Sequence, residues 1–293
     1  NIFCEELYNK FNNIDENETF FHKCIKYIQN VDFASTCAYN ADTYCYYRPK
    51  IQPLQSTSTS TSTSTSTSLS TLQSSDSYLS MKTLRHPIIE LINDEFKYIA
   101  NDIEFTPDNN GILLYGMNAS GKSSLMKSIG INLIMAQAGM FTSCQMTYFP
   151  YTKIYSRIPS GDNIFKGQST FVAEISEIRN ILKQADSRTL VIGDELCSGT
   201  ETTSAISIVS AGILDLVQKK SSFIFATHLH ELTSMDRIVK LTKTTSISPL
   251  ILSPLRIYHL SVTYDQKTKK LTYDRILKKG SGETLYGLEV CRS

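Results

Sequence analysis

The feature that most restricts the fold is the segment Gly116–Ser123, which fits the pattern GxxxxGK[ST]. It follows the apolar run Ile112–Tyr115 and leads into a predicted helix near Lys122–Ala138. Glycine at both ends lets the backbone curl so that successive N–H groups point at phosphate oxygens, and the helix N-terminus adds partial positive charge. The segment therefore predicts a strand, a phosphate-binding loop and a helix in succession.

Two side chains of this loop have specific expected tasks. Lys122 would neutralise the β- and γ-phosphates of a nucleotide, and the Ser123 hydroxyl would ligate Mg²⁺. A chance glycine-rich turn before a helix is the alternative, but the strand and the helix on either side favour phosphate binding. The predicted nucleotide-binding residues of the loop are Gly116, Met117, Asn118, Ala119, Ser120, Gly121, Lys122, Ser123 and Ser124.

Two acidic residues follow a second apolar strand, Leu190–Ile192. Asp194 at the strand tip would hold Mg²⁺, and Glu195 would polarise the attacking water. The alternative interpretation is that both acids are merely solvated at a strand end, but their position downstream of a phosphate loop favours the functional one. The adjacent pair favours an ABC-like P-loop ATPase over GTPases and kinases, so we expect ATP and Mg²⁺ as cofactors.

A histidine closes the third strand of the series. Phe223–Ala226 is apolar, and His228 follows it by two residues. An imidazole at this place could donate to the γ-phosphate and report its presence. Alone, His228 would be assigned as a surface or capping residue, so its role depends on the two preceding segments. The expected catalytic residues are Glu195, Lys122 and His228.

The alternation of strands and helices from Met81 onward predicts an α/β fold. We expect a mostly parallel sheet, flanked by helices, whose strand ends carry the site. Further helices are predicted near Phe171–Lys183 and Thr203–Gln218, and the segments Arg256–Tyr264 and Lys270–Lys278 predict a β-hairpin. One face of the helix near Phe171–Lys183 would be formed by Val172, Ile175, Ile178 and Leu182.

The N-terminal part has a different texture. Phe20–Tyr47 predicts one long helix with an apolar stripe, ended by Pro49. Ser56–Ser68 is a strict Ser/Thr alternation that cannot bury apolar surface, so we expect a disordered loop or linker. The expected division is a helical end of a core domain at 1–52, a low-complexity linker at 53–80 and an ATPase domain at 81–293.

Composition limits the possible partners. The formal net charge is +1 and no Lys/Arg run stands out, so a basic nucleic-acid footprint is not expected within this chain. No signal peptide or bilayer-length apolar stretch is present, which predicts an intracellular protein with no membrane partner, in a compartment left open. The first residue is Asn1 rather than Met, which suggests an excerpt from a longer protein.

The cysteines are scattered, which fits reduced thiols. Seven are present, and none forms a CxxC pair. A zinc site from His22, Cys24, Cys37 and Cys45 would match no ligand spacing, so buried small side chains are the favoured explanation.

Several segments resemble the MutS family of mismatch-repair proteins, in family order. Residues 167–177 read Gly-Gln-Ser-Thr-Phe-Val-Ala-Glu-Ile-Ser-Glu and are similar to the family's G-R-S-T-F-x-x-E-M-x-E. Residues 194–200 and 226–232 resemble its D-E-x-x-x-G-T and A-T-H-x-x-E-L. Residues 85–87 resemble the R-H-P that opens the ATPase domain, and residues 98–101 resemble the stretch that supplies an aromatic side chain against adenine. The amino-acid sequence of the phosphate loop resembles that of a divergent MutS clade of large DNA viruses and some mitochondria.

The resemblance implies ATP sites shared by two subunits. Ser169 would reach in trans to the partner's γ-phosphate, and Tyr98 would stack on adenine. The partners implied are a second MutS-type subunit in a homo- or heterodimer, double-stranded DNA bound through domains outside this chain, and a MutL-type protein. The sequence departs from the family at Gln168, where Arg is usual, and at Thr142–Cys144, where the family has V-P-A.

The function implied is Mg-ATP hydrolysis coupled to DNA clamping in mismatch repair. A transport-type ABC domain is a weaker reading, because it predicts L-S-G-G-Q where this chain has Gly-Gln-Ser-Thr-Phe. Two further readings stay open: a MutS relative that acts on recombination or branched DNA intermediates, and a nucleotide-binding scaffold that does not hydrolyse ATP.

Overall fold

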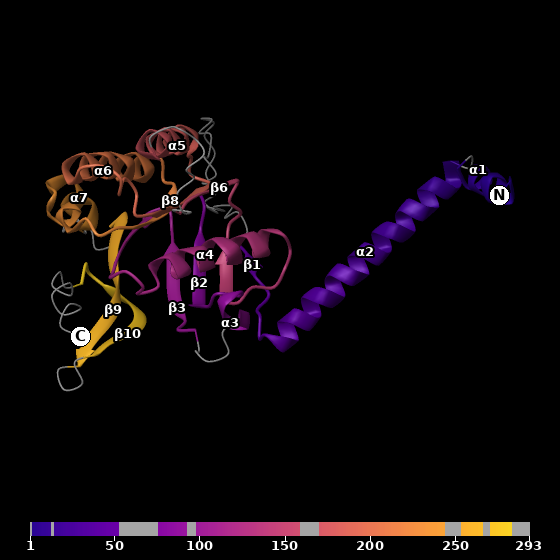
Figure 1. The fold of residues 1–293 in the computed structure, drawn as a ribbon, viewed down its shortest axis with the longest axis horizontal. Helices are drawn as coiled ribbons and strands as arrows, with labels where there is room; N and C mark the ends of the chain where they lie inside the picture. Colours follow the sequence, from indigo (N-terminus) through magenta and orange to yellow (C-terminus); the bar gives the residue numbers. More distant parts are fainter. Residues whose placement is uncertain are drawn as a thin grey trace, which may run out of the picture. The chain divides into compact units, whose positions relative to one another are not determined.

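The computed structural model describes residues 2–12, 15–52, 76–92, 98–158, 170–243, 253–265 and 270–282. The chain forms two compact units, Asn1–Tyr47 and Arg48–Ser293 (Figure 1). The Ser/Thr repeat Ser56–Ser68 lies outside the described residues.

The first unit consists of the helices α1 (Ile2–Asn12) and α2 (Asp15–Thr43). The predicted helix Phe20–Tyr47 exists, but it begins earlier and ends earlier than expected. The large apolar side chains along α2 are exposed, among them Ile25 at 53% and Ile28 at 64%. Within this unit, the predicted apolar stripe is therefore a solvent-facing stripe.

The prediction that Pro49 ends the long helix is wrong. The helix ends at Thr43, because Cys45 adopts a left-handed backbone with φ 53°. The N–H of Tyr46 then donates to the carbonyl of Ala41 at 3.0 Å, a bond that closes a helix C-terminus in this conformation. A left-handed residue thus ends the helix before the proline is reached.

The cysteines of this unit are not uniformly buried, which corrects the expectation from sequence. Cys37 is buried, Cys24 is half-buried, and Cys4 and Cys45 are exposed. One long helix and one short one have too little interior to cover four thiols. In the described parts of the chain, no three His, Cys, Asp or Glu side chains gather in a way that could hold a metal ion.

The second unit is built on a six-stranded sheet with the order β10-β9-β4-β8-β7-β6. Every neighbouring pair is parallel except β9 and β10, which form an antiparallel hairpin. The expected mixed α/β class and the C-terminal hairpin are thereby confirmed. The strands are β4 (Gly111–Tyr115), β6 (Lys153–Arg157), β7 (Thr189–Asp194), β8 (Ser222–Ala226), β9 (Leu255–Asp265) and β10 (Lys270–Lys279).

A second sheet of four strands was not predicted from the sequence. Its order is β1-β5-β2-β3, with β1 parallel to β5 and the other pairs antiparallel. Alternate residues of β2 (Leu79, Met81 and then, after a register shift, Leu84) are fully buried. The strands are β1 (Lys50–Ile51), β2 (Leu79–Leu84), β3 (Asn101–Phe105) and β5 (Gln145–Tyr148).

Strand β4 separates two apolar cores, because its successive side chains point to opposite faces. Ile112 and Leu114 pack with α4 and the four-stranded sheet, whereas Leu113 and Tyr115 pack on the side of α6. Figure 1 shows α5, α6 and α7 on one side of the sheet and α4 on the other. The helices are α3 (Ile89–Ile92), α4 (Lys122–Gln137), α5 (Thr170–Gln184), α6 (Thr202–Gln218), η2 (His230–Ser234) and α7 (Asp236–Thr242).

The three predicted helices α4, α5 and α6 are confirmed to within a residue or so at each end. On α5, Ile175, Ile178 and Leu182 pack into the second core as expected. Val172 does not, since it is 54% exposed. It lies in the first turn of α5, before the helix reaches α6, so the predicted four-residue face is three residues long.

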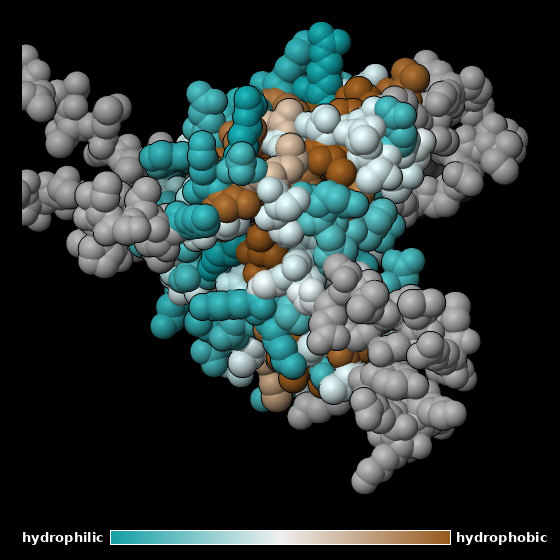
Figure 2. All heavy atoms as spheres, turned by 90° about the vertical axis from the view of Figure 1, so that its left-hand side faces the viewer, coloured by the Kyte–Doolittle hydropathy of each residue, from teal (hydrophilic) through white to brown (hydrophobic). Residues whose placement is uncertain are grey.

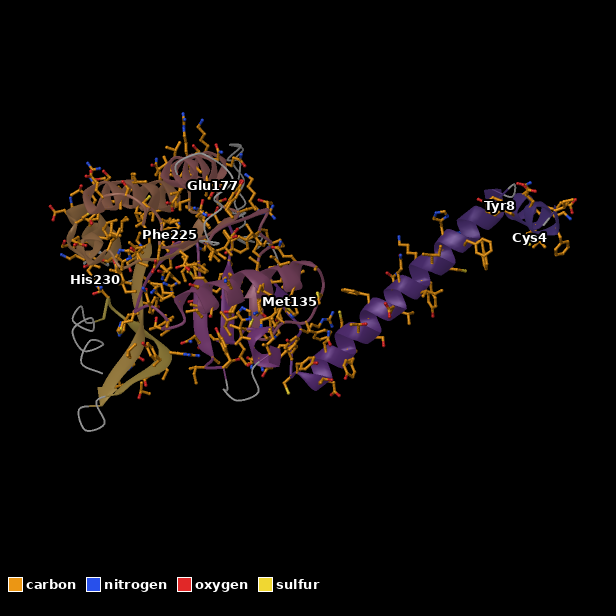
Figure 3. The ribbon with its side chains drawn as sticks, viewed as in Figure 1. Cys4, Tyr8, Met135, Glu177, Phe225 and His230 are labelled. Carbon is orange, nitrogen blue, oxygen red and sulfur yellow. The ribbon has the colours of Figure 1, made fainter. Side chains whose placement is uncertain are left out.

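The surface is mixed in polarity. Figure 2 shows the face that carries α6 and α7 as mainly hydrophilic, with separate small apolar patches. Side chains such as Phe225 point inward between sheet and helix (Figure 3), whereas Glu177 of α5 is exposed and pairs with Arg157 of β6. No helix in the described ranges has the length and hydropathy needed to cross a bilayer.

Gly111 sits where the central strand has no room for a side chain. A Cβ there would lie 2.3 Å from the Phe223 ring and 2.9 Å from Leu255. We expect Gly111→Ala to lower the free energy of unfolding by about 1–3 kcal/mol, the scale of an overpacked core. Urea denaturation measures this, with Gly199→Ala as the control because nothing lies within 4 Å of its Cβ. Equal stability of both variants would show that Phe223 yields freely.

Candidate functional site

The candidate site lies where three parallel strands end side by side. Leu114 of β4 and Asp194 of β7 are both in register with Ala226 of β8. The N–H of Glu195 donates to the Ala226 carbonyl at 2.9 Å, and the N–H of Thr227 donates to the Leu114 carbonyl at 3.1 Å. The loops that leave these strands therefore start from one edge of the sheet, the usual ligand edge of an open parallel sheet.

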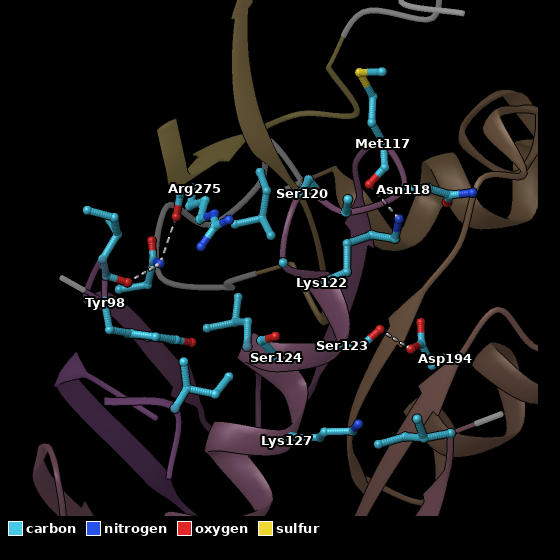
Figure 4. A pocket seen from close by; sticks show the side chains of 18 of the residues that line it. Tyr98, Met117, Asn118, Ser120, Lys122, Ser123, Ser124, Lys127, Asp194 and Arg275 are labelled. Carbon is cyan, nitrogen blue, oxygen red and sulfur yellow. Dashed lines mark hydrogen bonds between the residues drawn. The ribbon is translucent and has the colours of Figure 1, made fainter. Parts of the chain in front are cut away.

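A cavity of about 510 Å³ opens at this edge (Figure 4). Its size falls within the roughly 300–1,000 Å³ of small-molecule and cofactor sites. It brings together most of the residues that the sequence singled out: Tyr98, Met117, Asn118, Ala119, Ser120, Gly121, Lys122, Ser123, Ser124, Asp194 and Glu195.

The loop between β4 and α4 is curled by residues with positive φ. Gly116 has φ 153°, Ala119 has φ 64°, and Gly121 has φ 103°. A Cβ on Gly116 would lie 2.8 Å from the Oγ of Ser120, so a side chain at position 116 would clash with Ser120 inside the loop. The Ser120 Oγ is itself buried and has no hydrogen-bond partner in the described part of the chain. A curled backbone with an unused buried hydroxyl suits a ligand rich in acceptor oxygens.

Lys122 is the buried cation of the loop, with 5% of its side chain exposed. Its Nζ donates to the carbonyls of Gly116 at 2.7 Å and Met117 at 3.0 Å. Burial lowers the pKa of Lys122, while the nearby charges of Glu195 and Asp194 act in the opposite direction. An anion bound in the loop would stabilise the charged ammonium further, because its opposite charge offsets the cost of burying the lysine.

Ser123 and Asp194 join the first turn of α4 to the end of β7. The Ser123 hydroxyl donates to the Asp194 carboxylate, and Asp194 is 6% exposed. A hydroxyl and a carboxylate side by side are oxygen ligands of the kind that Mg²⁺ prefers. The residues present thus fit a magnesium ion bound together with phosphate oxygens.

Glu195 leaves β7 in a left-handed conformation, with φ 47°. Such a backbone is uncommon outside glycine and persists where neighbours fix it. Besides the bond of its N–H to Ala226, its carbonyl accepts the N–H of Ser198 at 3.2 Å. The side chain is 31% exposed and its Oε1 lies 4.0 Å from the Nζ of Lys122. A carboxylate so placed faces both the loop cation and the cavity.

The far end of the cavity is aromatic and apolar. Tyr98 lines it together with Ile89 and Ile99. Burial raises the pKa of Tyr98, whose hydroxyl is hydrogen-bonded to Ser128 of α4 and whose ring centroid lies 6.3 Å from that of His86. This anchoring leaves a fixed ring at the cavity wall, a surface on which a planar ring can stack.

Arg275 also lines the cavity, which the sequence did not indicate. It sits in an irregular stretch of β10 with φ 56°. The Nδ2 of Asn101 donates to the Arg275 carbonyl at 3.0 Å, and the Leu277 N–H donates to the Asn101 Oδ1 at 2.7 Å. Figure 4 shows Tyr98 and Arg275 on one side of the cavity and Lys122 with Asp194 on the other. Arg275 belongs to no short motif, so only the tertiary structure reveals it.

Among the described predicted site residues, Gly116 and His228 do not line the cavity. His228 is exposed after the end of β8. Ser169 lies outside the described residues. The contacts predicted for His228 and Ser169 stay predictions.

Comparison with known proteins decides the family. The family model of MutS domain V matches residues 112–293, which include the Gly116–Ser123 loop, Asp194, Glu195 and Arg275 but not the part of the cavity wall formed by residues 89–101.

The chain belongs to the MutS family. It is 34% identical to a protein named as a mutS homolog in Acanthamoeba polyphaga mimivirus, over 94% of this chain and 25% of the relative. It is 37% identical to the mitochondrial DNA mismatch repair protein mutS homolog of Sarcophyton glaucum, over 76% of this chain and 21% of the relative. It is 30% identical to the DNA mismatch repair protein MutS of Fusobacterium nucleatum, over 92% of this chain and 26% of the relative. The chain thus spans about a quarter of the length of these MutS relatives.

One departure from the MutS sequence pattern has a clear structural setting. Thr142–Cys144 is fully buried. The Ser143 N–H donates to the Oδ1 of Asn132 at 2.8 Å, and its hydroxyl donates to the Arg85 carbonyl at 2.8 Å. Polar residues in this loop therefore tie α4 to the end of β2.

Asn101 is expected to hold the wall that carries Arg275. Asn101→Ala would leave the Arg275 carbonyl and the Leu277 N–H unpaired, which costs about 1–3 kcal/mol of unfolding free energy. Asn101→Asp keeps the acceptor for Leu277 and should lose less. Urea denaturation and amide exchange along β10 measure both effects. Asn118→Ala, at an exposed position, is the control; an Asn101→Ala variant as stable as this control would refute the clamp.

Proposed function

We propose that this chain is the ATPase part of a MutS-type protein, a P-loop ATPase of ABC-like type that binds and hydrolyses Mg-ATP. The observation that carries the proposal is the single cavity that gathers the Gly116–Ser123 loop, Asp194 and Glu195 at one sheet edge. The names of the relatives describe DNA mismatch repair and support a role in that process. We propose that the hydrolysis is coupled to DNA clamping.

The loop residues hold the phosphates in this proposal. Backbone N–H groups at the start of α4 lack partners within the helix and donate to phosphate oxygens. Lys122 exchanges the carbonyls of Gly116 and Met117 for phosphate oxygens, which are stronger acceptors because they are charged. Asn118 and Ser124 complete the cradle. Tyr98 stacks on the adenine at the other end.

Ser123 and Asp194 hold Mg²⁺, which when bound supplies positive charge against the phosphates. Glu195 orients a water and accepts its proton as the water attacks the γ-phosphate. Its distance of 4.0 Å from Lys122 places the base next to the cation that holds the reacting group. In this scheme His228 contacts the γ-phosphate once ATP is bound in the site.

The proposal includes a partner subunit. Ser169, which precedes α5, contributes to the site of a second MutS-type subunit in a homo- or heterodimer. Double-stranded DNA is bound chiefly by parts of the longer protein, since this chain carries a formal charge of only +1. A MutL-type protein is the proposed downstream partner. The domain bounds 1–52, 53–80 and 81–293 belong to the same proposal.

Glu195→Gln and Lys122→Ala separate hydrolysis from binding. We expect Glu195→Gln to keep ATP affinity and to slow single-turnover hydrolysis by roughly 10²–10⁴-fold, the scale for loss of a general base. Lys122→Ala removes the phosphate-binding charge, so it should abolish ATP binding. Fluorescent-ATP titration with Mg²⁺ and hydrolysis of labelled ATP by excess protein measure the two quantities.

The control for the acid-to-amide change is Glu201→Gln. This residue follows the same strand but is exposed and bonds the Ser204 hydroxyl at 2.7 Å. It should behave like the parent chain. Hydrolysis by Glu195→Gln at the parent rate would exclude Glu195 as the base, and an equal loss of binding in both site variants would favour a scaffold that does not hydrolyse ATP.

A further inference from the structure

Glu174 is a buried carboxylate on α5 that the proposed reaction does not use. It is 8% exposed, and its Oε1 accepts the backbone N–H of Cys197 at 3.0 Å. Burial of a carboxylate is costly unless hydrogen bonds compensate it. A backbone N–H is a strong partner for such a charge. The contact therefore fixes the Cys197 amide with respect to α5.

The turn that Glu174 contacts is the one that begins with Glu195. Glu195 and Cys197 both have left-handed backbones, with φ 47° and 63°. Within the turn, Ser198 and Thr200 donate to the carbonyls of Glu195 and Cys197 at 3.2 and 3.3 Å. Two of the three residues 195–197 have left-handed backbones, and neither is a glycine. Such a turn needs support from outside itself. Ala226 supports the first, and Glu174 supports the second.

The thiol of Cys197 is also close to the charge of Glu174. Burial raises the pKa of Cys197 to about 11, and the charge of Glu174 acts in the same direction. The thiol is fully buried and stays protonated at neutral pH. Thus the backbone of Cys197, rather than its side chain, is the group that links Glu174 to the site.

We propose that Glu174 is a positioning residue for Glu195. Through the Cys197 amide it holds the turn in the left-handed form that aims the Glu195 carboxylate at Lys122 and the cavity. This inference rests on the proposed ATPase function. Glu174 does not touch the nucleotide, so its loss should change the rate of hydrolysis and leave nucleotide binding in place.

Three substitutions in the full 293-residue chain test the assignment. Glu174→Ala removes the acceptor, Glu174→Asp keeps the charge but shortens the reach, and Glu174→Gln keeps an oxygen at the same distance. The matched control is Glu177→Ala on the same helix, where the carboxylate is 58% exposed and pairs with Arg157 at 3.2 Å. Figure 3 shows this control residue on α5.

We expect Glu174→Ala and Glu174→Asp to slow single-turnover hydrolysis by roughly 10–100-fold, the effect of a misplaced catalytic group. Affinity for a fluorescent ATP analogue with Mg²⁺ should stay within about threefold, since the phosphate-binding loop is untouched. Glu174→Gln should restore most of the rate, because an acceptor oxygen remains. Amide hydrogen exchange of residues 195–200 should speed up in the Ala and Asp variants only.

The exchange measurement separates this inference from the proposed function. Unchanged exchange of residues 195–200 in Glu174→Ala, or hydrolysis at the parent rate, overturns the role of Glu174. An equal loss of affinity and rate also overturns it, as does the same loss in Glu177→Ala. If Glu174→Ala fails to fold, the contrast between the Asp and Gln variants decides. If the parent chain hydrolyses no ATP, the proposed function fails; if Glu195→Gln hydrolyses ATP at the parent rate, Glu195 is not the base. In either case amide exchange still tells whether Glu174 holds the turn.

Discussion

The site depends on the backbone of one strand, β8, which lies between β4 and β7. Its last residue, Ala226, is paired with Leu114 on one side and Asp194 on the other. Parallel strands stand about 4.7–4.9 Å apart, so one intervening strand fixes the gap between the loop after β4 and the acids after β7. That gap is the one bridged by Ser123 and Asp194. A slip of β8 by one residue would break this alignment and turn its side chains to the wrong cores.

The two buried charges of the cavity, Lys122 and Asp194, each have a fixed hydrogen-bond partner. Lys122 rests on two loop carbonyls, and Asp194 accepts the Ser123 hydroxyl. These contacts offset the cost of burying the two charges. Phosphate oxygens and a divalent ion would replace them with stronger ones. The half-exposed Glu195 is the least enclosed of the acids, as suits a group that must meet water.

The parts of this picture that the sequence predicted are local. The loop after β4 and the acids after β7 follow from residues within a few positions of one another. Asn101 and Arg275 are 174 positions apart in the sequence, and Glu174 and Cys197 are 23 positions apart. Neither contact can therefore be predicted from the spacing within a motif. The four-stranded sheet was missed for a similar reason, because β1 and β5 are short and pair across a long stretch of chain. The end of α2 escaped prediction because Cys45, rather than glycine, takes the left-handed position.

The irregular stretch at Arg275 also bears on how this chain behaves at high concentration. β10 is an edge of the six-stranded sheet, and a straight edge strand invites pairing with another molecule. Asn101 occupies the carbonyl of Arg275 and the N–H of Leu277, groups that an added strand would need. The break in register twists the strand, and the exposed Lys278 and Lys279 add like charges that repel a second copy. The same feature that brings an arginine to the cavity therefore protects the sheet against edge-to-edge aggregation.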